Sequence, residues 1–234
     1  MEMNNKNVST EKKRMWLALI PTIVMVALMW LFFIVSHTHL INIDMFRLGI
    51  LPRRADGLVG IIFSPLVHSS VSHLLSNTLP ILILVWSLFY FYNQIAFKSL
   101  IVLWLMSGFF TWIIGRESYH VGASGLIFSL AFFLFFSGIF RRYIPLIAVS
   151  LVVAFVYGST VWSIFPFASL VDADISWEGH LAGTISGFIL AVVLRNKGPQ
   201  RPVKEWDEDV REEENEADSR EIDQGDDDGF FLEN

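Results

Sequence analysis

The feature that most constrains the fold of this chain is a series of long stretches that contain no charged residue. They cover 15–43, 57–97, 99–115, 118–140, 143–171 and 179–194. An apolar helix needs about 20 residues to cross the roughly 30 Å hydrocarbon core of a bilayer. Together with a hydrophobic content of 53%, this pattern excludes an ordinary soluble domain and predicts an all-α membrane protein.

Six membrane spans are predicted, at 15–36, 71–91, 97–115, 124–140, 143–160 and 178–195. The first apolar stretch is too long for a signal-peptide core of about 7–15 residues and has no evident small-residue cleavage site, so we interpret it as a membrane helix. An even number of spans places both termini on one side of the membrane. Basic residues are more frequent on that side, as at Lys12–Arg14 and Arg141–Arg142, which predicts that both termini are cytoplasmic.

The spans divide the chain into three parts. Residues 1–14 form a predicted cytoplasmic segment, 15–197 the membrane domain and 198–234 a cytoplasmic tail. Between 205 and 228 the tail is crowded with Asp and Glu and nearly free of apolar residues, so we expect it to be disordered. The chain has no cysteine, which excludes disulfides and thiolate chemistry, and no basic surface typical of nucleic-acid binding.

Four polar residues interrupt the apolar stretches near their beginnings, where an unpaired polar group is costly. His73 and Asn77 fall in the first turns of the second span, Ser124 opens the fourth, and His180 lies near the start of the sixth. Because these three spans run in the same direction, all four residues are expected at the same face and at similar depth. The fourth span is only about 25 Å long, so its serine should lie below the membrane surface.

The residue types at this depth are those of acyl transfer. A serine hydroxyl needs a base within about 2.6–3.2 Å, and His180 can supply it if the fourth and sixth spans pack closely. Gly122 and Gly125 flank the serine, and Gly183 and Gly187 line one face of the sixth span. Small residues four apart let membrane helices approach backbone to backbone. Since no acidic residue lies at membrane depth, we predict a Ser–His dyad.

A second pair of side chains is suited to stabilising an oxyanion. His73 and Asn77 are four residues apart and share one helix face, and the backbone N–H of Ser124 opens a helix nearby. Taken alone, the pair is more typical of interhelical hydrogen bonds, but beside the serine and histidine we interpret it as an oxyanion site. No His-Glu-x-x-His motif and no suitably spaced carboxylate accompany these residues, so no metal or cofactor is expected. His68 is interpreted as a loop anchor and His120 as a loop residue near the entrance of the site.

These residues, in this order, resemble the rhomboid family of intramembrane serine proteases. The resemblance covers about 60–195 and rests on the motifs His68-x4-His73-x3-Asn77, Gly122-Ala123-Ser124-Gly125 and Gly179-His180-x-x-Gly183-x-x-x-Gly187. It implies a six-helix bundle with Ser124 as nucleophile, His180 as general base and acid, and His73, Asn77 and the Ser124 N–H as the oxyanion site. It also implies substrates that are membrane proteins cut in or near a transmembrane helix, at a site opening to the non-cytoplasmic side of the cell membrane.

Some positions depart from the family pattern. Arg47, Arg53 and Arg54 stand in the first outer loop in place of a Trp-Arg pair, and no glutamate occurs at the inner end of the second span. Phe128 stands where many members have a tyrosine stacked on the catalytic histidine. The aromatic loop at 161–177 is equally suited to capping the site or to anchoring at the membrane interface.

Two functions other than proteolysis are alternatives for this sequence. One is a catalytically silent rhomboid-like protein that binds or escorts membrane clients, although such relatives typically lack the serine or the histidine, and this chain has both. The other is a small transporter, which would show internal repeats and polar groups near the midplane of the membrane. The sequence predicts neither an oligomeric state nor a particular substrate.

Overall fold

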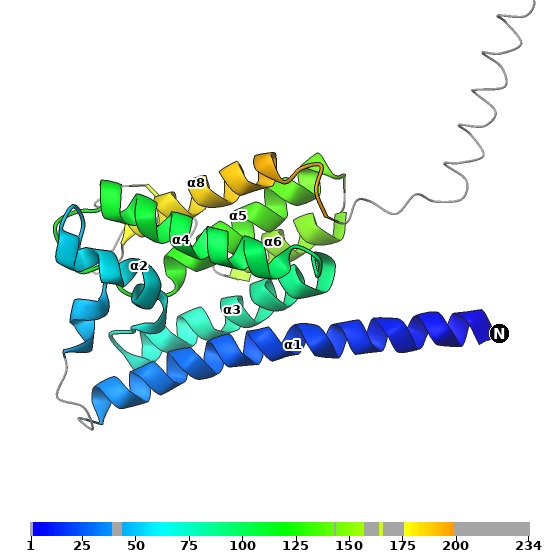
Figure 1. Cartoon of the computed structure of the whole chain (residues 1–234), viewed down its shortest axis with the longest axis horizontal. Coiled ribbons are helices and arrows are strands. Elements are labelled where there is room, and N and C mark those ends of the chain that lie inside the picture. The colour runs from blue at the N-terminus through cyan, green and yellow to red at the C-terminus, as the bar shows by residue number, and fades with distance from the viewer. Residues whose placement is uncertain (1, 39–43, 143, 157–163, 166–175, 199–234) are drawn as a thin grey trace, which may run out of the picture. The chain divides into compact units, whose positions relative to one another are not determined.

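The computed structural model of the chain describes residues 2–38, 44–142, 144–156, 164–165 and 176–198 (Figure 1). Nearly all of the predicted tail at 198–234 and most of the loop at 161–177 lie outside these residues. The described part is helical and contains no strand, only an isolated antiparallel bridge between Ile50 and His120. The predicted all-α class is therefore confirmed.

The α-helices and 3₁₀ helices follow one another with short connections. They are α1 (Glu2–His37), η1 (Met45–Leu48), η2 (Ala55–Val59), α2 (Gly60–Phe63), η3 (Ser64–Leu66), α3 (Val71–Phe91), α4 (Ala96–Ile114), α5 (Ser124–Phe140), α6 (Ile144–Val156) and α8 (Trp177–Val193). Within the described residues, α1, α3 and α4 are long and apolar enough to cross a membrane. Helices α5 and α8 are also apolar but shorter, at 17 residues each.

Helix boundaries follow local capping signals. The side chain of Ser70 accepts a hydrogen bond from the backbone N–H of His73 and so begins α3 where the sequence predicted it. Ser176 does the same for α8 through the N–H of Gly179. Helix α1 begins well before the predicted span at 15–36, because the preceding polar segment contains Glu, Lys and Arg, which favour helix.

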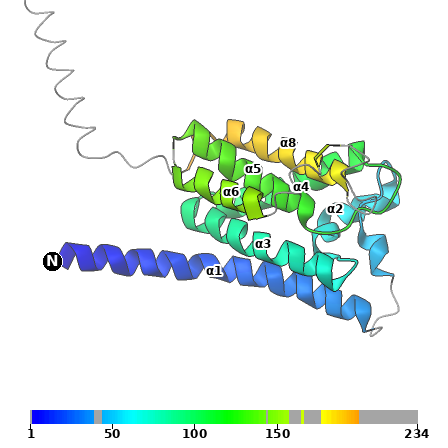
Figure 2. The same ribbon diagram turned by 180° about the vertical axis from the view of Figure 1, so that it is seen from behind.

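Helix α5 lies at the centre of the bundle and packs against α3, α4, α6 and α8, most extensively against α8. Helix α1 packs along α3, and both ribbon views place α1 on the opposite side of α3 from α5 (Figures 1 and 2). The shared core is aliphatic and aromatic, and its fully buried members include Leu84, Leu88, Leu130, Phe133 and Leu134. These side chains come from α3 and α5, which form the centre of the core, while α8 packs on both α5 and α4 and adds Leu190 and Ala191 to it.

The contact between α5 and α8 brings the two backbones together. A Cβ atom added at Gly183 would lie 2.1 Å from the carbonyl oxygen of Gly125, and one at Gly187 would lie 2.4 Å from that of Ser129. No residue with a side chain fits at such distances without moving the helices apart. The two glycines therefore set how closely α8 approaches α5.

The segment between α1 and α3 folds onto one end of α4 and α5. The indole N–H of Trp104 donates to the carbonyl of Ile61 at 3.2 Å, and the guanidinium of Arg53 donates to the carbonyl of Gly115 at 2.6 Å. The backbone N–H of Gly122 donates to the carbonyl of Ser64 at 2.9 Å. Residues 44–66 thereby hold the 115–123 segment, which leads into α5.

At the opposite end of α5, a buried cation joins three helices. The Arg141 side chain donates to the hydroxyl of Ser137 at 2.9 Å and to the carbonyls of Leu194 and Lys197 at 2.6 and 2.7 Å. The Tyr92 hydroxyl lies 2.7 Å from the same serine. Arg141 is only 6% exposed, so this residue, which the sequence analysis used as a marker of the membrane boundary, is an internal cap for the end of α8.

Candidate active site

Ser124 is the first residue of α5 and follows a glycine with an unusual backbone. Gly122 has a φ of +103°, which L side chains rarely adopt. A Cβ atom there would also lie 2.6 Å from both Cε1 and Nε2 of the His73 ring. Glycine is thus required twice over, and its absent side chain lets the imidazole reach within two residues of Ser124.

The His73 ring is held by its own helix turn. Its Nδ1 atom lies 3.1 Å from the hydroxyl of Ser69, and its Nε2 edge lies against Gly122. Asn77, one turn further along α3, is buried, and its amide nitrogen donates to the carbonyl of His73 at 2.7 Å. That bond uses one of the two amide hydrogens of Asn77.

His180 lies in the first turn of α8 and is 3% exposed. Its ring stacks on Phe128 with a centroid separation of 4.4 Å and an interplanar angle of 19°. A Cβ atom at Gly125 would lie 3.3 Å from the carbonyl oxygen of Gly179, so the first turns of α5 and α8 lie at the same level.

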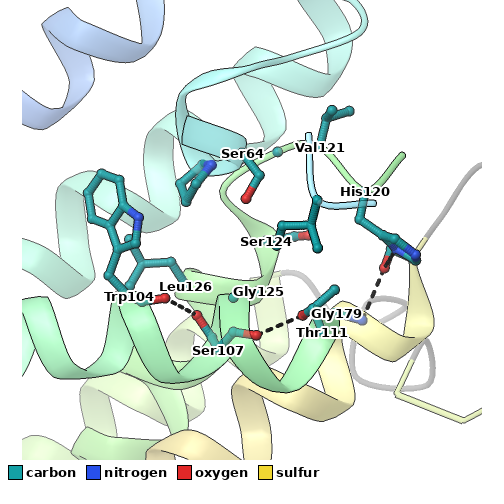
Figure 3. A pocket seen from close by; sticks show the side chains of 15 residues that line it. Ser64, Trp104, Ser107, Thr111, His120, Val121, Ser124, Gly125, Leu126 and Gly179 are labelled. Atoms are coloured by element: carbon teal, nitrogen blue, oxygen red, sulfur yellow. Dashed lines mark hydrogen bonds between the residues drawn. The ribbon is translucent and has the colours of Figure 1, made fainter. Parts of the chain in front are cut away.

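A cavity of about 30 Å³ lies beside Ser124 (Figure 3). Its polar lining comes from several elements and includes Ser64, Ser107, Thr111, His120, Ser124 and Ser176. A cavity needs roughly 10–15 Å³ and several polar partners to hold one water molecule. The space therefore accommodates about two waters next to the serine hydroxyl.

Three ionisable side chains near the site, Glu178, His120 and His68, are buried. Glu178 is 2% exposed, and its Oε1 atom accepts a hydrogen bond from the backbone N–H of Arg116 at 3.3 Å and lies 3.8 Å from the guanidinium of the same residue. Burial lowers the pKa of His120, which the nearby Glu178 carboxylate partly opposes. On the other side of His73, burial and that neighbouring ring lower the pKa of His68 to about 4.

The sequence analysis missed two partners of these groups. His120 binds Ser176 through Nδ1 at 2.6 Å, and Ser69 binds the ring of His73. Neither serine belongs to a motif, and Ser176 is 56 positions away from His120 along the chain. The capping position of Ser176 before an apolar helix was the one signal that pointed to a structural role.

Comparison with known proteins gives a consistent result. The family described as Rhomboid domain matches residues 55–197. An uncharacterized protein of Mycobacterium tuberculosis, Rv1337, is 34% identical over 202 residues, which cover 83% of this chain and 82% of that protein; Mb1372 of Mycobacterium bovis gives the same values. ML1171 of Mycobacterium leprae is 34% identical over 163 residues, or 67% of this chain and 63% of that protein.

Proposed function

The chain belongs to the rhomboid family, and we propose that it is an active intramembrane serine endopeptidase that cleaves membrane proteins in or beside a transmembrane helix. The family acts on membrane-protein substrates within the bilayer, and the three long apolar helices make this chain an integral membrane protein. The main support for this proposal is the close packing of α5 against α8. Their first turns lie side by side, and these turns contain Ser124 and His180.

In the proposed reaction, the Ser124 Oγ attacks the carbonyl carbon of the scissile peptide while His180 accepts the hydroxyl proton. The carbonyl oxygen becomes an oxyanion, which the N–H groups of Ser124, His73 and Asn77 stabilise. When the C–N bond breaks, His180 returns the proton to the leaving amine. Water then attacks the acyl-enzyme with His180 again as base, and the hydroxyl of Ser124 is restored.

Two features of the site support this chemistry. The cavity beside Ser124 has room and polar partners for the water that deacylation consumes. The Phe128 ring stacks on one face of the His180 imidazole and restricts its rotation, which favours a fixed direction for proton transfer.

The proposed topology has six membrane spans, cytoplasmic termini and a catalytic site that opens to the non-cytoplasmic side of the cell membrane. The bias of Lys and Arg toward the termini side supports this orientation. A substrate helix must unwind locally before its carbonyl can be attacked, since a helical carbonyl is already hydrogen-bonded. Segments with helix-breaking Gly or Pro should therefore be preferred.

The test is cleavage of a single-span reporter protein in liposomes by wild type, Ser124→Ala and His180→Ala. We expect cleavage by wild type only, with both variants folded. Cleavage by Ser124→Ala would refute the assigned nucleophile. If a fluorophosphonate does not label folded wild-type protein, the silent, client-binding alternative is favoured instead.

A further inference from the structure

His120 is a buried residue of the 115–123 segment, four positions before Ser124. Its backbone is fixed without help from the side chain, because it exchanges two hydrogen bonds with Ile50, at 2.9 and 2.8 Å. The side chain is 5% exposed and borders the cavity beside the serine (Figure 3). The imidazole can therefore be changed while the path of the backbone is retained.

The contacts of the His120 ring define where its proton lies. Nε2 is 3.0 Å from the carbonyl oxygen of Arg116, and because a carbonyl can only accept, Nε2 must carry hydrogen. In the neutral ring, Nδ1 is then an acceptor, and it lies 2.6 Å from the hydroxyl of Ser176. The serine hydroxyl donates to this nitrogen.

The same Ser176 oxygen caps helix α8. It accepts a hydrogen bond from the backbone N–H of Gly179 at 3.0 Å, one residue before His180. A continuous polar chain thus runs from Arg116 through His120 and Ser176 to the first turn of α8. We call the His120–Ser176 contact the clasp.

A second contact runs in parallel with the clasp. Glu178, also in the first turn of α8, accepts from the backbone N–H of Arg116 and faces its guanidinium. Burial lowers the pKa of His120, and the hydrogen bond to the Arg116 carbonyl and the Glu178 carboxylate oppose this only in part. Since the neutral ring is favoured, the directions of the hydrogen bonds in the clasp persist at neutral pH.

The glycine contacts and the clasp constrain different movements. Gly183 and Gly187 set the distance between the α5 and α8 backbones, but a contact without side chains does not fix rotation or fraying of the first turn of α8. The clasp ties that turn to the segment that carries the nucleophile. We propose that His120 is a positioning residue, which acts through Ser176 to hold His180 in register with Ser124. This inference rests on the proposed protease function.

The proposal makes a specific prediction for the rate of serine modification. Fluorophosphonate labelling reports the reactivity of Ser124 without a substrate helix. We expect His120→Ala to lower the labelling rate constant and kcat about tenfold with little change in KM, because the misplacement affects the chemical step. His120→Gln, which keeps one donor and one acceptor, should recover most of the rate.

A double-mutant cycle separates the clasp from general loosening of the loop. Ser176→Ala removes both the clasp and the cap of α8, so it should be the slower single variant, and adding His120→Ala to it should slow labelling no further. Tyr119→Ala is the matched control, because this neighbour in the same segment is 41% exposed and should label like wild type. All rates are compared for protein that retains its cooperative thermal transition.

The outcomes distinguish the two proposals. If folded His120→Ala is labelled as fast as wild type, or if the two substitutions have fully additive effects, the proposed role of the clasp is refuted and the protease function is not. Absence of labelling in folded wild type would overturn the protease function and with it the catalytic role of the clasp. Slow labelling in His120→Ala with rescue by His120→Gln would support both.

Discussion

The close backbone contact between α5 and α8 predicts that replacing its glycines by alanine lowers the reactivity of Ser124 by amounts that depend on the space at each position. A methyl group at Gly183 would lie 2.1 Å from the carbonyl oxygen of Gly125, and ordinary contact begins at 3.4 Å. The helices must therefore separate by about 1 Å at this point. At Gly125 the nearest atom to an added methyl is 3.3 Å away, so Gly125→Ala requires almost no movement.

The expected magnitudes follow from these distances. Overpacking of this kind costs about 1–3 kcal/mol, offset by up to about 1 kcal/mol from the better helix propensity of alanine. A displacement of about 1 Å between nucleophile and base is expected to lower the rate constant about 100-fold. The Gly183→Ala protein should thus remain folded, while its Ser124 loses most of its reactivity.

The assay is the second-order rate constant of fluorophosphonate labelling in detergent micelles, with thermal unfolding measured on the same samples. Gly187→Ala, with a clearance of 2.4 Å, should fall between Gly183→Ala and Gly125→Ala or close to the former. If folded Gly183→Ala labels as fast as Gly125→Ala, the helix spacing does not control the dyad and the reasoning is wrong.

Three further predictions concern other contacts. Burial lowers the pKa of His68 to about 4, so the folded state holds its ring neutral while the unfolded chain binds a proton near pH 6.5. The free energy of unfolding should therefore fall by about 3 kcal/mol as the pH drops from above 6.5 toward 4. Unfolding in micelles at several pH values measures this loss, and His68→Gln should abolish it. Phe128→Leu should slow labelling severalfold and Phe128→Tyr should not, because only the first removes the ring stacked on His180; equal rates would contradict this role. Arg141→Ala should lower the free energy of unfolding by about 2–4 kcal/mol, since the donors to Leu194 and Lys197 are lost, yet leave the labelling rate of folded protein unchanged.

Much of the fold could be predicted from hydrophobic pattern and capping residues. The boundaries of α3 and α5 agree with the predicted spans 71–91 and 124–140, because a serine cap begins one and a basic pair follows the other. The helical class and the family were also predicted and are confirmed. The number of spans, the orientation and the catalytic roles of Ser124 and His180 stay predictions.

Other features depend on contacts between distant parts of the chain. Arg47, Arg53 and Arg54 were assigned to an outer loop, but Gly60 packs against the backbone of Gly49, and the segment folds into short helices over α4. The clasp joins residues with no common motif. Arg141 was interpreted by its charge as a boundary residue, whereas Ser137 in its own helix and two distant carbonyls, of Leu194 and Lys197, make its burial favourable.

The attachment of α8 at both ends has a consequence for the surrounding lipid. A helix in a bilayer commonly accommodates a change in hydrocarbon thickness by tilting or sliding. Helix α8 cannot slide without breaking its contacts to Arg141 at one end and to the clasp at the other. Its 17 residues extend about 25 Å, less than the roughly 30 Å of a typical hydrocarbon core. If α8 spans the bilayer as proposed, the acyl chains beside it would have to compress to match its length, and a thicker membrane would deform around this helix without shifting it past α5.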